Sequence, residues 1–174
     1  MSKATAPLFS LQASGAFAKT LVFDRRGYVR QYVIPANPKT SAQANIRTPF
    51  AGIAAVVKAV GNTAKADIKA ALEAQGKTTY RWNAEIIKAA LENDYWNQKA
   101  AIFNGYDSSY QSAWAQSAQN TGINPSAVPY GTAPDFYPGL AAFVVASALH
   151  EKLGIGPGAP SASNYTDWTS YIVS

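Results

Sequence analysis

The hydrophobic pattern of this chain changes its period at the segment Pro35–Pro38. Before this segment, side chains alternate with period two over residues 16–23 and 28–34, which predicts two β-strands. The link Asp24–Gly27 consists of turn-forming residues and predicts a hairpin loop. A proline cannot donate a ladder hydrogen bond, so the second strand should end at Pro35. Because two strands alone are marginal in water, this hairpin should pack on helices or extend a sheet of another subunit.

After the prolines, apolar residues recur at spacings of three and four, which is typical of helices. Thr40 and Gln43 form a capping-box pattern, and one apolar stripe follows it at Ile46, Phe50, Ile53 and Val57. Pro49 interrupts this stretch and predicts either a kink or a fresh helix start with Thr48 as its cap. We expect helices over residues 40–60, 64–75, 80–104, 108–119 and 138–153, with 80–104 as the central helix.

Together these elements define an α+β fold that is mostly α, in which the N-terminal β-hairpin (16–34) packs on four to five helices. We expect an N-terminal arm over residues 1–15, a single domain over 16–154 and a C-terminal arm over 155–174. The segment Asn120–Pro138 is rich in proline and aromatic residues, and loops of this length usually serve function or a partner. The Gly/Pro/Ser-rich stretch after Gly154 predicts an extended C-terminal segment that docks on another subunit.

The composition excludes most catalytic chemistry. The chain has no cysteine, which excludes disulfides, thiolate metal sites and a cysteine nucleophile. His150 is the only histidine, and on a helix the adjacent Glu151 points about 100° away from it, a poor position for orienting a base. The run Gly154–Gly158 lacks the Lys-Ser/Thr pair of a phosphate-binding loop. We therefore expect no enzyme and no catalytic, cofactor-binding or metal-binding residue.

The longest apolar run, Leu140–Leu149, is much shorter than the roughly 20 residues of a membrane span and predicts a buried helix. The N-terminal residues lack the pattern of a secretory signal. A soluble protein without a membrane partner is the expectation.

Charge is distributed unevenly along the chain. Residues 1–58 hold eight Lys or Arg and one acidic residue, which gives +7, whereas residues 59–174 hold seven basic and nine acidic residues, which gives −2. Opposite charges of this kind can orient subunit packing, and a basic region also suits a nucleic acid. Composition leaves both interpretations open.

Two groups of side chains are candidate contact residues. The first is basic and aromatic, which suits phosphate contact, base stacking or a charged subunit interface, and it comprises Arg25, Arg26, Tyr28, Arg30, Tyr32 and Arg47. The second is aromatic, which suits a subunit interface because aromatic rings often anchor interfaces, and it comprises Tyr130, Phe136, Tyr137, Tyr165, Trp168 and Tyr171.

A family resemblance rests on the region around the prolines. The basic turn Arg25-Arg26-Gly27 is followed by the motif Pro35-x-Asn37-Pro38-x-Thr40-x-x-Gln43-x-x-x-Arg47 and then by Trp-containing helices. This pattern resembles a group of small virion-associated proteins of tailed phages and prophages. The resemblance implies a non-enzymatic structural protein of the virion, synthesised in the host cytoplasm, that binds copies of itself and other virion proteins such as capsid, portal or tail proteins.

The position in the particle stays open among capsid decoration, a neck or head–tail connector role and a tail-associated role. The alternative function is a small DNA-binding or DNA-packaging accessory protein that uses the basic hairpin. Its affinity would fall with salt, because neutralised phosphates release counterions.

Overall fold

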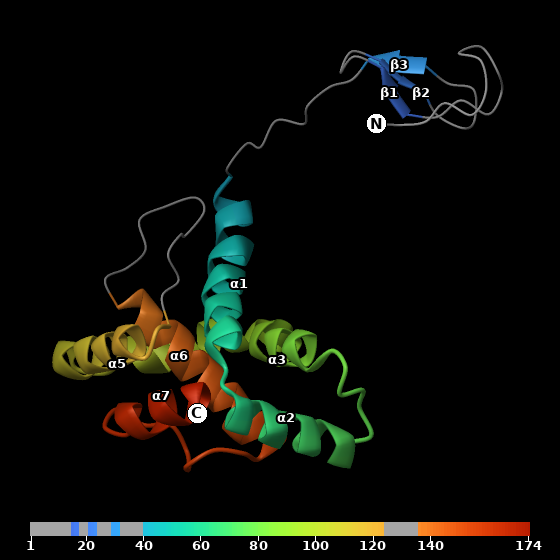
Figure 1. The fold of residues 1–174 in the computed structure, drawn as a ribbon. Helices are drawn as coiled ribbons and strands as arrows, with labels where there is room; N and C mark the ends of the chain where they lie inside the picture. Colours follow the sequence, from blue (N-terminus) through green and yellow to red (C-terminus); the bar gives the residue numbers. More distant parts are fainter. Residues whose placement is uncertain (1–14, 18–20, 24–28, 32–39, 124–135) are drawn as a thin grey trace. The chain divides into compact units, whose positions relative to one another are not determined.

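The computed structural model describes residues 15–17, 21–23, 29–31, 40–123 and 136–174. The chain divides into two units, Met1–Pro38 and Lys39–Ser174. The first unit contains three short strands that pair antiparallel in the order β1-β2-β3 (Figure 1), with bounds Gly15–Phe17 for β1, Leu21–Phe23 for β2 and Val29–Gln31 for β3. The predicted hairpin loop, Asp24–Gly27, lies outside the described residues.

The second unit is helical. Its elements are α1 (Ser41–Ala59), α2 (Asn62–Ala74), α3 (Trp82–Leu91), the 3₁₀ turn η1 (Glu92–Asp94), α4 (Tyr95–Asn104), α5 (Ser108–Asn120), α6 (Tyr137–Ala148), the π-helical turn η2 (Leu149–Leu153) and α7 (Tyr165–Val173). Residues 40–123 and 136–174 contain no strand, so the predicted α+β class is wrong and this is a helical protein. The physical reason is that the apolar faces of the helices cover one another and need no sheet.

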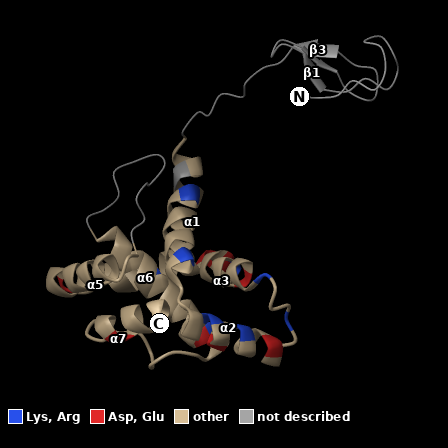
Figure 2. Cartoon of the chain, in the orientation of Figure 1, with Lys and Arg blue, Asp and Glu red and all other residues tan. Residues whose placement is uncertain are grey.

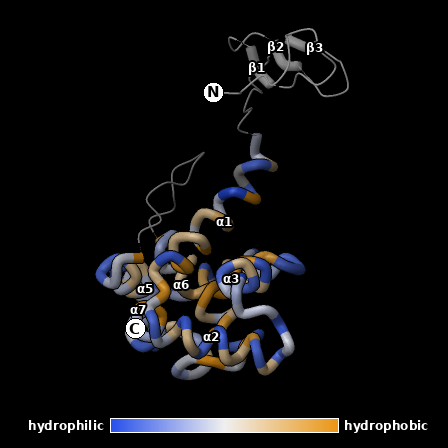
Figure 3. The backbone as a smooth tube through the Cα atoms, turned by 45° about the vertical axis from the view of Figure 1, so that its right-hand side comes forward, coloured by the Kyte–Doolittle hydropathy of each residue, from blue (hydrophilic) through white to orange (hydrophobic). Residues whose placement is uncertain are grey.

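The centre of this unit is α6. Its residues are apolar on every side, which requires burial all round, and those with no solvent exposure include Ala141, Ala142, Val144, Val145 and Ala146. The helices α1, α3, α4, α5 and α7 pack around it, and Figure 3 labels all of these except α4. Phe143 of α6 contacts three further aromatic rings at centroid distances of 5.5–5.6 Å, those of Phe103, Tyr106 and Trp114. The predicted buried helix over the apolar run is thus the central helix, in place of 80–104.

The predicted long helix 80–104 is broken. Asn93 and Asp94 both adopt left-handed backbone conformations, with φ of 53° and 61°, so α3 ends before them and α4 begins after them. Asn and Asp tolerate this region better than other residues with a Cβ. The Asn97 side chain also donates a hydrogen bond to the Asp94 carboxylate at 2.6 Å. Tyr95 and Trp96, directly after the break, are both buried in the core.

The predicted C-terminal arm is also wrong, because α7 is part of the core. Trp168 is fully buried, and its neighbour Thr169 shares a hydrogen bond with Ser117 of α5 at 2.6 Å. Trp114 of α5 donates its indole N–H to the Ser161 carbonyl at 3.1 Å, which fixes the segment before α7. The aromatic residue Trp168 of this segment, which was predicted to dock on another subunit, therefore packs into the core of its own chain.

The end of α7 meets the start of α2. The N–H of Gly61 donates to the Ile172 carbonyl at 2.9 Å, and the N–H of Thr63 donates to the Ser174 carbonyl at 2.8 Å. Each helix end thereby satisfies backbone groups that have no partner inside the other helix. A Cβ on Gly61 would lie 2.5 Å from the Ser174 carbonyl carbon, so only glycine fits this contact.

Candidate interaction surface and ligand pocket

The first half of α1 carries an exposed apolar surface. Thr40 caps the helix through its side-chain oxygen, which accepts from the Gln43 N–H at 3.3 Å, and α1 then continues through Pro49 without the fresh start considered above. Ile46 is 71% exposed and Phe50 49% exposed, whereas Ile53, on the same stripe, is fully buried. Figure 1 shows the start of α1 rising beyond the other helices of the unit. The apolar stripe therefore extends past the helices that cover its second half.

Contacts on another side of α1 hold this half in place. The Tyr137 hydroxyl donates a hydrogen bond to the Thr48 carbonyl, and burial raises the pKa of Tyr137 to about 12. Gly52 permits this approach, since a Cβ there would lie 2.7 Å from the Tyr137 oxygen. Pro49 is buried as well. The exposed stripe is consequently presented on a helix that is anchored at its middle.

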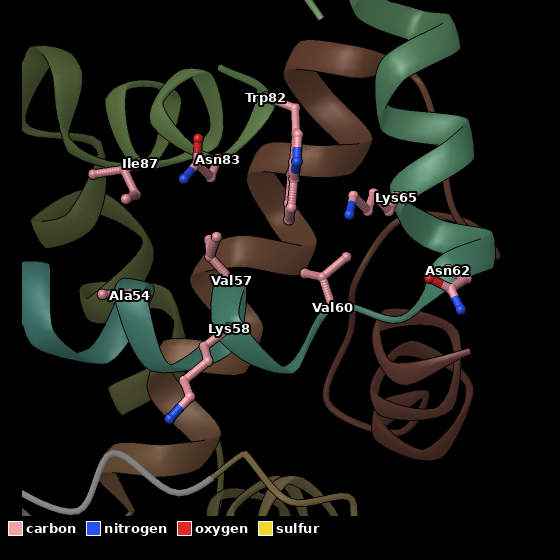
Figure 4. A pocket seen from close by; sticks show the side chains of 9 residues that line it. All are labelled: Ala54, Val57, Lys58, Val60, Asn62, Lys65, Trp82, Asn83 and Ile87. Atoms are coloured by element: carbon pink, nitrogen blue, oxygen red, sulfur yellow. The ribbon is translucent and has the colours of Figure 1, made fainter. Parts of the chain in front are cut away.

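Farther along α1, a pocket of about 420 Å³ opens between the C-terminal half of α1, the start of α2 and the start of α3 (Figure 4). Its lining residues are Ala54, Val57, Lys58, Val60, Asn62, Lys65, Trp82, Asn83 and Ile87. Trp82 stands as one wall, with Val57 of α1 and Val60, the residue after α1, directed toward it. An apolar floor with a few polar groups at its edge is the usual composition of a binding pocket.

The polar side of this pocket is basic. The Lys65 ammonium lies 5.6 Å from the centroid of the Trp82 ring, a cation–π contact. Lys58 is exposed at the edge and points away from the indole (Figure 4). None of the nine lining residues is acidic, and neither lysine has an ion-pair partner among the residues that the structure describes. The arrangement can bind an anionic group beside an apolar one.

A second polar cluster joins α4 to η2. Glu151 accepts hydrogen bonds from the Tyr95 hydroxyl at 2.8 Å and from the Lys99 ammonium at 2.5 Å. Burial would raise the pKa of Glu151, but these two hydrogen bonds and the charge of Lys99 outweigh it and hold the pKa below the ordinary value of 4.5. Burial, together with the bond to Glu151, raises the pKa of Tyr95. Both oxygens of the carboxylate are thus engaged, and the cluster links two helices.

The basic group predicted from sequence falls largely outside the described residues. Arg25, Arg26, Tyr28 and Tyr32 lie there, and of Arg30 only the backbone, in β3, is described. Arg47 lies on α1, whose basic residues are accompanied by no acidic one (Figure 2). The DNA-contact patch therefore stays a prediction.

The aromatic group divides between core and surface, apart from Tyr130, which lies outside the described residues. Tyr137 and Trp168 are buried in their own chain and offer no surface to another subunit. Phe136 and Tyr165 are half-buried against the core. The half-buried Tyr171 donates its hydroxyl to the Asp67 carboxylate of α2 at 2.9 Å. These rings act first as packing residues of this chain.

Sequence reasoning did not single out the Trp82 pocket. Lys65 and Trp82 lie on different helices, α2 and α3, and no local motif joins them. The 3–4 spacing predicts the stripe with Ile46 and Phe50, but the exposure of these side chains depends on where the other helices end. Only the folded arrangement supplies that information.

Within the described ranges, no group of three or more His, Asp or Glu residues could hold a metal ion. Likewise, no helix there has both the length and the apolar character that crossing a membrane requires. Comparisons with protein-family models, with curated proteins and with solved structures find no match for this chain.

Proposed function

We propose that this protein is a non-enzymatic structural protein of a tailed-phage virion, which acts by binding copies of itself and other virion proteins. The proposal combines the resemblance of the Pro35–Arg47 motif with the surface that the same region presents in the structure. The motif ends on the first turns of α1, next to the exposed stripe.

The observation that carries the proposal is the exposure of Ile46 and Phe50 on an anchored helix. Full burial of a side chain of this kind stabilises a structure by about 1.5–3 kcal/mol. Scaled by their exposed fractions of 71% and 49%, the two side chains together offer about 2–4 kcal/mol to an interface. Paired apolar residues on a helix face are the usual anchors of helix-mediated association.

A charge-insertion experiment tests the surface. The double variant Ile46→Glu with Phe50→Glu places two carboxylates on the stripe, and light scattering reports the solution mass. We expect the native chain to assemble to a multiple of its 18.5 kDa mass and the double variant to assemble more weakly. Ile102→Glu is the matched control, because Ile102 of α4 is also an exposed isoleucine, at 47%.

The reasoning fails if Ile102→Glu lowers the mass as much as the double variant does. It also fails if the native chain is a monomer that does not sediment with purified phage particles. Circular dichroism of all three proteins verifies that each is folded.

A further inference from the structure

The Trp82 pocket and the exposed stripe of α1 lie along one side of the helix. Phe50, Ala54 and Val57 follow at spacings of four and three, so the stripe leads directly to the pocket wall. Ala54 and Val57 line the pocket, whereas Phe50 is exposed beyond it. A partner seated on the stripe would thus reach the pocket with a neighbouring part of its chain.

We propose that this pocket binds an acidic segment of a partner virion protein, with an aromatic or large aliphatic side chain against Trp82 and a carboxylate at Lys65. This inference rests on the proposed function, because it names the chemistry of the partner that the virion protein binds. The pocket volume of about 420 Å³ lies within the range of about 300–1,000 Å³ typical of ligand sites and accommodates one large side chain.

Charge complementarity selects an acidic occupant. The Lys65 ammonium faces the indole, Lys58 adds a second positive charge at the edge, and no lining residue is acidic. The charged residues of α1 are all basic. A basic segment would place like charges beside Lys58 and Lys65 and would be rejected. The apolar contact supplies most of the affinity, since ion pairs at an exposed rim contribute little, and the lysines mainly supply discrimination.

The indole N–H signal of Trp82 can report binding to the pocket. Trp96, Trp114 and Trp168 are buried, so Trp82 is the tryptophan that a bound ring contacts directly. In a ¹⁵N-labelled sample, its indole N–H signal is assigned with the conservative variant Trp82→Phe.

Three blocked tripeptides serve as probes: acetyl-Asp-Phe-Asp-amide, acetyl-Asn-Phe-Asn-amide and acetyl-Lys-Phe-Lys-amide. They share the aromatic anchor and differ in charge. We expect the acidic peptide to shift the Trp82 signal at the lowest concentration, the neutral peptide to require more, and the basic peptide to bind most weakly. Lys65→Gln should weaken the acidic peptide about two- to fivefold, or about 0.4–1 kcal/mol, and leave the neutral peptide unchanged.

The inference is overturned if the acidic tripeptide does not bind more tightly than the neutral and basic ones. It is also overturned if the tripeptides shift only the signals of residues outside the pocket. The failure of the virion proposal is separately visible, since its test uses Ile46 and Phe50 and leaves Lys65 intact. Loss of assembly in the Ile46→Glu, Phe50→Glu variant combined with unresponsive tripeptides would reject the pocket inference alone. Charge-ordered tripeptide binding combined with unchanged assembly in that variant would support the pocket and contradict the α1 surface.

Discussion

Replacing Gly156 by alanine tests whether the C-terminal segment closes the core as the structure shows. Gly156 has φ of 107°, and a Cβ there would lie 2.6 Å from Cζ3 and 2.9 Å from Cζ2 of the Trp168 ring, with Cη2 closer still. Trp168 has no solvent exposure, so its ring is enclosed by the residues of the core. The substitution therefore combines an unfavourable backbone angle with overpacking.

Gly154 offers a matched control, since it also has a positive φ, of 70°, but its added Cβ would meet nothing within 4 Å. The left-handed conformation costs a residue with a Cβ about 1–2 kcal/mol, offset by about 0.4–1 kcal/mol because alanine restricts the unfolded chain more than glycine does. Overpacking adds about 1–3 kcal/mol in Gly156→Ala only. We expect a loss of about 1 kcal/mol for Gly154→Ala and about 2–4 kcal/mol for Gly156→Ala.

Thermal unfolding followed by circular dichroism measures the difference. For a chain of this size, 1 kcal/mol corresponds to about 2–4 °C, and the two variants differ by about 1–3 kcal/mol, so Gly156→Ala should melt about 2–12 °C below Gly154→Ala. Near-ultraviolet circular dichroism should also change in Gly156→Ala, since the environment of Trp168 is disturbed. Equal melting temperatures in the two variants would refute the packing of Trp168 against residue 156.

Three further predictions concern the helical unit. Gly139→Ala should lower the free energy of unfolding in urea by about 1–3 kcal/mol, since its Cβ would lie 2.6 Å from the Ala115 backbone nitrogen where α5 and α6 meet; an unchanged value would contradict that close approach. Asn93→Ala should lower the free energy of unfolding by about 1 kcal/mol and Asn93→Gly should leave it almost unchanged, because glycine accepts φ of 53° without strain. Equal losses in the two variants would contradict the break between α3 and α4. The ionised Glu151 carboxylate, whose folded pKa is lowered, stabilises the fold above about pH 4.5, and this stabilisation is lost as the pH falls through the folded pKa. Because 43% of the side chain is exposed, it contributes under about 1 kcal/mol to the free energy of unfolding. Glu151→Gln should therefore reduce the fall of the free energy of unfolding in urea below about pH 4.5, and an unchanged fall would contradict this role.

Local patterns predicted individual helices better than their assembly. The cap at Thr40 and the apolar run that became α6 depend on neighbouring residues, and such signals are present in the sequence itself. The break at Asn93 has a local cause as well, but the 3–4 spacing of apolar residues continues across it and conceals it. The fold class failed because an alternating pattern predicts strands without saying what they pack on.

Exposure was less predictable than helicity, and this limited the candidate site. Trp168 and Phe50 are both aromatic residues on amphipathic helices, yet one is fully buried and the other is half exposed. The difference arises from the approach of α5 and α2 to α7, which no short pattern encodes. Lys65 and Trp82 meet for the same reason, through the packing of two helices.

The most direct test of the proposed virion role is mass spectrometry of purified particles from a phage or prophage whose genome carries this sequence. The account predicts that the protein is present in washed particles at a fixed ratio to the major capsid protein, as a structural subunit must be. Particles that assemble and infect without any copy of it would contradict a role in the virion.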